Sequence, residues 1–200
     1  MCSSDLDEDY NSPFTIDELK EALGKAHDSA PGPDHVHYQL LRHLPEVCLE
    51  VLLVAFNRIW LQGNFPDSWR NAIVIPIPKP GRDPCEAGNQ RPISLTSCVC
   101  KTMERMINER LVYYLEINNL ITEVQCGFRK NRSTIDHLIR LESLIKDAFI
   151  NKERVVSIFF DLEKAYDTTW KHGILKDLFE MGLRGHLANF IANFLENRQF

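Results

Sequence analysis

Asp161 is the residue of this chain whose type and position best suit it for chemistry. It follows residues 155–160, a run of Val, Ser, Ile and Phe whose composition predicts a β-strand. A carboxylate at the end of a buried strand is costly unless something pairs with it. Mg²⁺ prefers such oxygen ligands, and the chemistry would be metal-assisted phosphoryl transfer. The residues alone leave one alternative open, an acid that caps the next turn.

Tyr166 lies five residues after Asp161, where the chain is expected to turn away from the strand. An aromatic ring at that point can wall a site that receives a sugar. The alternative is a half-buried tyrosine that only packs in the fold.

Basic residues in loops marked by proline or glycine are the candidates for binding phosphate. They are Arg91, which precedes Pro92, and Arg129, Lys130 and Arg132, which follow Gly127. Arginine presents a planar fork of N–H donors that fits a phosphate group. A glycine lets the backbone approach a ligand closely. The alternative for each basic residue taken singly is a solvated surface charge.

The charge distribution keeps nucleic acid among the candidate partners although the chain is acidic overall. The formal net charge is −5, but residues 1–30 alone carry eight acidic and two basic side chains. That segment accounts for −6, so the rest of the chain is close to +1. A local basic patch can therefore bind phosphate.

Composition also bounds the location of the protein. No apolar run reaches the roughly 18 residues of a membrane-spanning helix, and residues 1–5 are too polar for a secretory signal. The 6 cysteines include no CxxC pair, so we expect reduced thiols rather than a zinc site. We expect a protein of the cytoplasm and nucleus, neither secreted nor bound to a membrane.

The first half of the chain is predicted to be mostly helical. Residues 1–13 are expected to be a disordered acidic lead, and Thr15 with Glu18 forms a capping box for a helix to about residue 27. Residues 38–62 are predicted helical, with Pro45 either a kink or the first turn of a second helix. Residues 72–77 are predicted to be an edge strand, and residues 90–95 a loop.

The second half alternates helices with one strand. A long helix is predicted from Ser97 to about residue 118, and another after Ser133, with Ile135, Leu138, Ile139, Ile145 and Ala148 facing inward. The predicted strand 155–160 follows. Helices are then expected at about residues 169–181 and 186–196.

Six short motifs, in this order, resemble the reverse transcriptase of non-LTR (LINE-like) retrotransposons, most closely the jockey-like elements. They are SAPGPD (29–34), GNFPDSWR (63–70), IPIPKPG (75–81), RPISL (91–95), QCGFRKNRST (125–134) and FDLEKAYD (160–167). The resemblance covers nearly the whole chain from about Phe14. Any one motif is a weak signal, but six at matching spacing are a specific one.

The resemblance implies an α+β right-hand polymerase. Residues 14–152 would form the fingers with an N-terminal extension, and residues 153–200 the start of the palm. It implies RNA-directed DNA synthesis with an RNA template, a DNA primer, deoxynucleoside triphosphates and two Mg²⁺ ions.

The same resemblance assigns roles to individual residues. Asp161 matches the first catalytic palm aspartate, which holds both metals, and the backbone at Leu162 would lie at the metal site beside the incoming triphosphate. Tyr166 falls on the steric gate that rejects a ribose 2′-OH. Arg91 would contact the triphosphate. The backbone of template or primer would be bound by Arg129, Lys130 and Arg132.

The sequence also departs from the family pattern. His35 stands where the family usually has glycine, and Gln90 where it usually has an aromatic residue. The second catalytic motif, the rest of the palm and the thumb are expected after residue 200, so we expect no polymerisation by these 200 residues alone. Two other readings stay open: a non-catalytic remnant that binds nucleic acid or protein, and a group II intron maturase-like reverse transcriptase.

Overall fold

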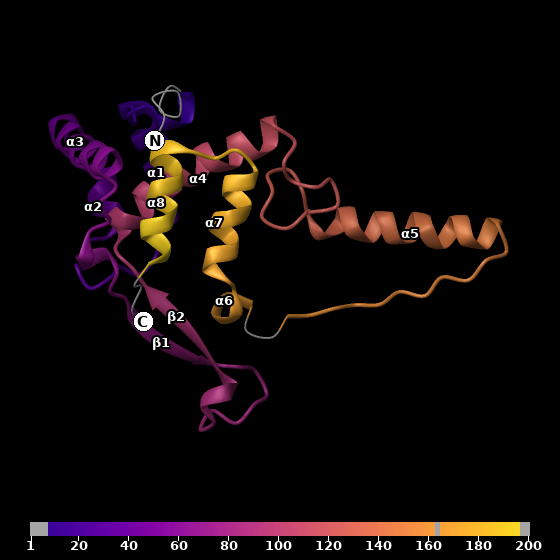
Figure 1. The fold of residues 1–200 in the computed structure, drawn as a ribbon. Helices are drawn as coiled ribbons and strands as arrows, with labels where there is room; N and C mark the ends of the chain where they lie inside the picture. Colours follow the sequence, from indigo (N-terminus) through magenta and orange to yellow (C-terminus); the bar gives the residue numbers. More distant parts are fainter. Residues whose placement is uncertain (1–7, 163–164, 197–200) are drawn as a thin grey trace. The chain divides into compact units, whose positions relative to one another are not determined.

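The computed structural model describes residues 8–162 and 165–196, apart from the side chains of Tyr166 and Asp167. The chain divides into two compact units, residues 1–114 with 171–200 and residues 115–170, and each is described by itself. The boundary predicted at residue 152 does not coincide with this division. The described part is helix-rich with one small sheet (Figure 1).

Helices form the core of the first unit. They are α1 (Ile16–Gly24), α2 (Tyr38–Arg42), α3 (Glu46–Gln62), α4 (Cys98–Ile117, which continues into the second unit), α7 (Lys171–Glu180) and α8 (Gly185–Leu195). Large side chains at the centre are almost fully buried, among them Leu19, Phe56, Trp60, Met103 and Leu187. Burial of this apolar area from both ends of the sequence holds the unit together.

Local signals set several helix ends as predicted. The Thr15 hydroxyl accepts from Glu18 N at 3.3 Å, and Thr15 N donates to the Glu18 carboxylate at 2.8 Å, which completes the capping box. Pro45 is the residue in front of α3, so residues 38–62 form two helices rather than one kinked helix. Gly63 ends α3 with a φ of +66°, a conformation that favours glycine.

The loop at residues 29–35 packs against the start of α4. A Cβ on Gly32 would lie 2.5 Å from Ser97 N, so only glycine allows this approach. His35 N donates to Gly32 O at 3.1 Å and closes a turn in which His35 adopts a φ of +56°. The glycine expected from the family at position 35 would adopt this backbone without strain.

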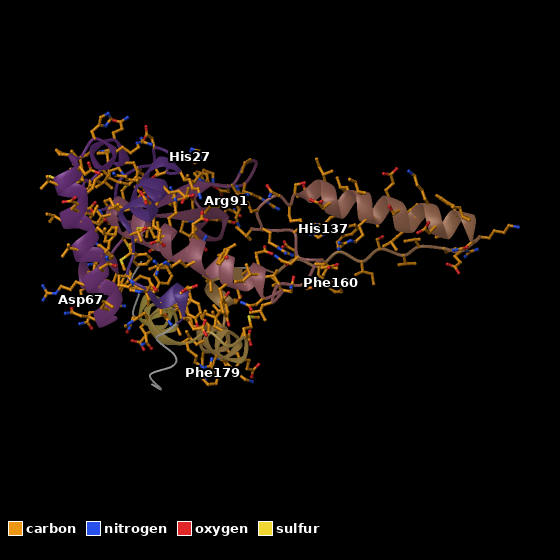
Figure 2. All side chains as sticks on the ribbon, turned by 90° about the horizontal axis from the view of Figure 1, so that it is seen from above. His27, Asp67, Arg91, His137, Phe160 and Phe179 are labelled. Carbon is orange, nitrogen blue, oxygen red and sulfur yellow. The ribbon has the colours of Figure 1, made fainter. Side chains whose placement is uncertain are left out.

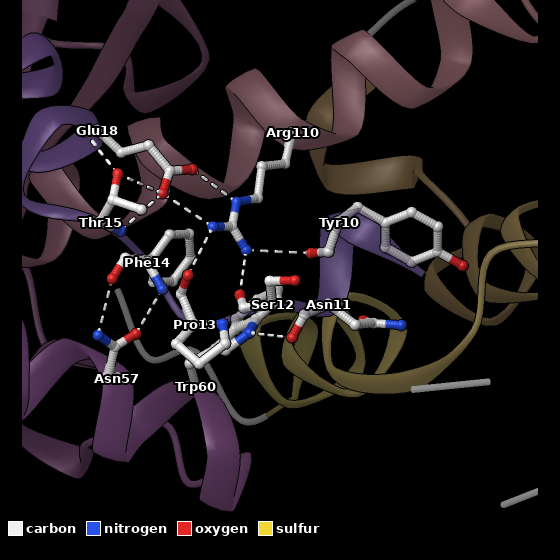
Figure 3. A network of polar contacts seen from close by, with 10 residues as sticks. All are labelled: Tyr10, Asn11, Ser12, Pro13, Phe14, Thr15, Glu18, Asn57, Trp60 and Arg110. Atoms are coloured by element: carbon white, nitrogen blue, oxygen red, sulfur yellow. Dashed lines mark hydrogen bonds and ion pairs between the residues drawn. The ribbon is translucent and has the colours of Figure 1, made fainter. Parts of the chain in front are cut away.

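Arg110 on α4 anchors the segment that precedes α1 (Figure 3). Its guanidinium bonds both carboxylate oxygens of Glu18, at 2.7 and 2.8 Å. It also donates to the carbonyls of Tyr10, Ser12 and Pro13. The expectation of disorder is therefore wrong for residues 8–13, because a partner 97–100 residues away binds their backbone.

The sheet is a two-stranded antiparallel hairpin of β1 (Ile73–Pro78) and β2 (Gln90–Leu95), paired from Ile73↔Leu95 to Pro78↔Gln90. The predicted strand is confirmed within one residue. The loop predicted at residues 90–95 is wrong, because pairing with β1 makes it a strand despite Pro92. Both strands are edge strands, where proline is tolerated.

The second unit contains the end of α4, helix α5 (Thr134–Ile150), an extended segment and α6 (Ala165–Thr168). Ser133 and Asp136 form a capping box at the start of α5. The inward face predicted for α5 is only partly correct: Ala148 is buried and Ile145 half-buried, but Ile135, Leu138 and Ile139 are exposed.

The strand predicted at residues 155–160 is wrong in this structure. The segment is extended but has no ladder partner among the described residues (Figure 1). A β-strand is stabilised by hydrogen bonds to a neighbouring strand, and an apolar pattern in the sequence does not provide that neighbour. Val156, Phe159 and Phe160 are 84–91% exposed as a result. Figure 2 labels Phe160 on this segment.

Candidate functional site

Asp161 lies in the extended segment between α5 and α6, with an exposed side chain. No ion pair joins it to another described residue. The cost of burying an unpaired carboxylate, on which the sequence argument relied, does not apply to an exposed group. Its carboxylate remains an accessible oxygen ligand of the kind that Mg²⁺ takes.

The other residues predicted for the metal and sugar site follow Asp161 closely. Leu162 is 78% exposed. Tyr166 belongs to α6, but its side chain lies outside the described residues. Within the described ranges, no three His, Cys, Asp or Glu side chains are grouped so as to hold a metal ion.

Arg91 lies on β2 opposite Ile77, with an exposed side chain. Side chains alternate between the faces of a strand, so Arg91 shares a face with Ile93 and Leu95. The hairpin loop is closed by Lys79, whose N–H donates to Asn89 O at 2.8 Å and whose ammonium donates to Gly88 O at 2.9 Å. Arg91 belongs to the first unit and the other predicted site residues to the second.

Arg129, Lys130 and Arg132 lie on one turn between α4 and α5, as predicted, but they differ in their partners. Arg129 binds both carboxylate oxygens of Glu116, at 2.8 and 2.6 Å, and its side chain is 12% exposed. It also donates to Thr122 O at 2.9 Å and to Gln125 O at 3.2 Å. Lys130 and Arg132 are exposed.

Electrostatics reinforce the Glu116–Arg129 pair. The hydrogen bond from Arg129 holds the pKa of the Glu116 carboxyl below its usual value. The same bond raises the pKa of Arg129 above its usual value. Both groups therefore stay charged across the ordinary pH range.

Sequence reasoning missed Glu116, and no sequence signal marks it. The residue lies 13 positions before Arg129 at the end of α4, and the other two acceptors of Arg129, Thr122 O and Gln125 O, are main-chain carbonyls. Every residue type carries a main-chain carbonyl, so the sequence cannot show which carbonyls accept from Arg129. Only the structure identifies these hydrogen bonds.

In the part of the chain that the structure describes, no helix is both long enough and apolar enough to cross a membrane.

The chain is similar to proteins of mobile elements. It is 34% identical over 193 residues to the RNA-directed DNA polymerase from mobile element jockey of Drosophila melanogaster. The corresponding polymerase of Drosophila funebris is 34% identical over 189 residues. Both matches cover 94% of this chain and 20–21% of the relative, so the chain spans about a fifth of the length of these curated relatives.

The chain is also similar to a relative at lower sequence identity. The retrovirus-related Pol polyprotein from type-1 retrotransposable element R2 of Popillia japonica is 25% identical over 187 residues, which is 92% of this chain and 25% of that protein. The family model described as reverse transcriptase (RNA-dependent DNA polymerase) matches residues 77–200, more than half of the chain. The chain therefore belongs to the reverse transcriptase family.

Proposed function

We propose that this chain is a segment of an RNA-directed DNA polymerase of a non-LTR retrotransposon. The observation that carries the proposal is the family match over residues 77–200 together with 34% identity to the jockey polymerases along 94% of the chain. The reaction would be template-directed nucleotidyl transfer from deoxynucleoside triphosphates to a DNA primer on an RNA template. The fold of the intact protein would be a right-hand polymerase, to which this chain contributes fingers and part of the palm.

Asp161 is proposed as one ligand of the catalytic Mg²⁺ ions, with the main chain of Leu162 beside the triphosphate. Two-metal transfer needs carboxylates that hold two cations about 3.5–4 Å apart. The described residues group no three candidate ligands, so their donor set is incomplete for the metal. The role proposed for Asp161 is therefore that of a single ligand.

Arg91 is proposed as a contact to the triphosphate. Its exposed guanidinium on a short hairpin is able to present a fork of donors to phosphate oxygens. Lys130 and Arg132 are proposed as contacts to the nucleic-acid backbone, because both are exposed on one turn. Mg²⁺ would supply charge neutralisation as pyrophosphate leaves.

Tyr166 is proposed as the gate that selects deoxyribose, and this role gives a direct test. The jockey polymerase of D. melanogaster with its aligned segment replaced by this chain is expected to extend a primer on RNA with deoxynucleotides. Tyr166→Ala is expected to raise the rate of ribonucleotide incorporation by roughly 10-fold or more. A steric clash that adds about 1.4 kcal/mol to the barrier slows a reaction tenfold, and the substitution removes the clash.

Tyr113→Ala is the matched control, because Tyr113 is exposed on α4 and has no assigned role. Unchanged sugar discrimination in Tyr166→Ala would reject the gate. Absence of template-directed extension by a folded chimera would reject the proposed function itself.

A further inference from the structure

The turn between α4 and α5 is held at both ends. At its start, Arg129 donates to Glu116 on α4 and to the carbonyls of Thr122 and Gln125. At its end, Ser133 N donates to the Asp136 carboxylate at 2.6 Å, and Ile135 N donates to the Ser133 hydroxyl at 3.2 Å. The residues between these two anchors are therefore presented in a defined conformation.

Arg129 has almost no donor left for a ligand. Its guanidinium has five N–H donors, and four hydrogen bonds to Glu116, Thr122 and Gln125 use four of them. A bidentate phosphate contact needs two parallel N–H donors. Arg129 therefore cannot bind phosphate in this way without breaking its bonds to Glu116 or to the turn.

Phe128 is placed where physical chemistry does not favour an aromatic residue. Its side chain is 97% exposed and its backbone has a φ of +60°, which is unusual for a bulky residue. Neither burial nor local conformation accounts for the ring. Strain of this kind persists where the surrounding structure imposes it and often coincides with a functional position.

The surroundings of Phe128 indicate the chemistry of a partner. Lys130 and Arg132 are exposed within four residues of the ring. The carboxylates that act on Arg132 are already hydrogen-bonded, Glu116 by Arg129 and Asp136 by Ser133 N. An aromatic face beside backbone-binding cations is the arrangement with which proteins bind single-stranded nucleic acid. The bases stack on the ring and the cations contact the phosphates.

We propose that residues 128–132 bind unpaired nucleotides, with Phe128 stacking on a base, Lys130 and Arg132 contacting phosphates, and Arg129 acting only as a positioning residue through Glu116. This site rests on the proposed function for its nucleic-acid partner. It goes beyond that function by adding Phe128 and by removing Arg129 from the contact surface.

The first experiment asks whether Arg129 positions the turn or contacts phosphate. The two roles predict changes of opposite sign in RNA affinity when Glu116 is neutralised. The purified 200-residue chain is titrated with a fluorescent 12-nucleotide single-stranded RNA at several NaCl concentrations, with anisotropy as the readout. Glu116→Gln is expected to weaken binding about 5-fold or more, because it releases the turn. If Arg129 contacts phosphate instead, Glu116→Gln removes a negative charge, frees the guanidinium and strengthens binding, which would overturn the positioning role.

Glu123→Gln is the matched control, since it removes a negative charge from the turn itself and Glu123 is none of the hydrogen-bond acceptors of Arg129. It is expected to leave the affinity unchanged or slightly raised. Should Glu116→Gln fail to fold in a thermal melt, Arg129→Lys takes its place, because lysine keeps the charge but lacks the fork. Wild-type affinity in Arg129→Lys would likewise overturn the positioning role.

The second experiment separates the contribution of the Phe128 ring to RNA binding from that of Lys130 and Arg132. Phe128→Ala is expected to lose roughly 5- to 150-fold in affinity for the RNA, as for one base–aromatic stack, with the salt dependence unchanged. The affinity of Phe128→Ala for an abasic oligonucleotide of the same length is expected to equal that of the wild type. Lys130→Ala with Arg132→Ala should instead lower the slope of log K against log[salt] by about 1.4, or about 0.7 for each contact on a single strand.

Unchanged affinity of Phe128→Ala for the base-bearing RNA would overturn the stacking role and leave the ring as a contact for protein. Equal losses on RNA and abasic oligonucleotide would also overturn it. These binding assays need no catalysis. Their failure is therefore distinguishable from failure of the primer-extension test of the proposed function.

Discussion

Arg110 and Glu18 are a partly buried pair whose energetics depend on pH. Burial by itself raises the pKa of Glu18, but the hydrogen bonds from Arg110 and from Thr15 N outweigh it, and the pKa lies below its usual value. A carboxyl group with a lowered pKa in the folded state stabilises the fold above its unfolded-state pKa. It loses that contribution as the pH falls through the folded-state pKa.

Glu18→Gln is accordingly expected to lower the free energy of unfolding by about 1.5–3 kcal/mol near pH 7, the range for a lost hydrogen bond to a charged group. The difference from wild type should shrink as the pH falls through the lowered pKa of Glu18, measured by urea unfolding at each pH. Glu21→Gln, which breaks an exposed pair with Lys25, should cost no more than about 0.5 kcal/mol. A pH-independent effect of Glu18→Gln would contradict the assigned coupling.

His35 is a second residue with a predictable effect. Its φ of +56° is a conformation that costs an L-amino acid about 1–2 kcal/mol but costs glycine, which has no Cβ, little. His35→Gly is expected to raise the free energy of unfolding by about 0.5–1 kcal/mol in the same assay. His37→Gly is the control: His37 has an ordinary φ of −92°, so glycine there should not stabilise. Destabilisation by His35→Gly would show that the imidazole makes a compensating contact.

At the scale of elements, helix α8 receives its N-terminal cap from the other end of the chain. Asn11 is 2% exposed, its Oδ1 accepts from Leu187 N at 3.1 Å, and its Nδ2 donates to Arg184 O at 3.2 Å. Trp60 on α3 donates its indole N–H to Asn11 O at 3.1 Å. Gly185 allows this approach, since a Cβ there would lie 2.3 Å from Asn11 Nδ2.

Asn11→Ala is therefore expected to destabilise the chain by about 1–3 kcal/mol, because it removes a cap and leaves buried polar groups without partners. Thermal unfolding followed by circular dichroism measures the effect. Asn11 ends a short 3-10 helix, Asp9–Asn11, in which Asp9 is exposed. Asp9→Ala should change stability by less than about 0.5 kcal/mol. Equal effects of the two substitutions would contradict the capping role.

The helices were largely predictable because their signals are local. The capping boxes at Thr15 and Ser133, the proline before α3 and the glycine after it are all read from neighbouring residues. The failures concern contacts between distant segments. Strand β2 depends on β1, and the order of residues 8–13 depends on Arg110.

The candidate site divides in the same way. Its residue types were recognisable from the motifs, and the exposed positions of Arg91, Lys130 and Arg132 agree with a surface role. The binding of Arg129 within its own turn was not predictable, because its acceptors include main-chain carbonyls. The predicted strand at residues 155–160 failed because apolar composition specifies a tendency and not a pairing partner.

At the scale of the whole molecule, the family match begins at residue 77, but the core of the first unit begins earlier. Phe14, Leu19, Phe56 and Trp60 are buried together with residues of α4 and α8. Truncating even one such large side chain to alanine costs about 2–5 kcal/mol, against a net stability of roughly 5–15 kcal/mol for a typical domain. The segment before residue 77 is therefore integral to this fold.

Asp161 is proposed above as a metal-binding carboxylate of a polymerase. The most direct measurement is primer extension on RNA by the jockey chimera that carries this chain, with Asp161→Asn compared with Asp177→Asn, an exposed carboxylate on α7. Asparagine keeps the shape but removes the charge that a cation needs. Asp161→Asn is expected to lower extension at least about 1,000-fold, or roughly 4 kcal/mol in the barrier, while Asp177→Asn extends at the rate of the parent chimera. Extension by Asp161→Asn at the parental rate would contradict the metal-binding role of Asp161.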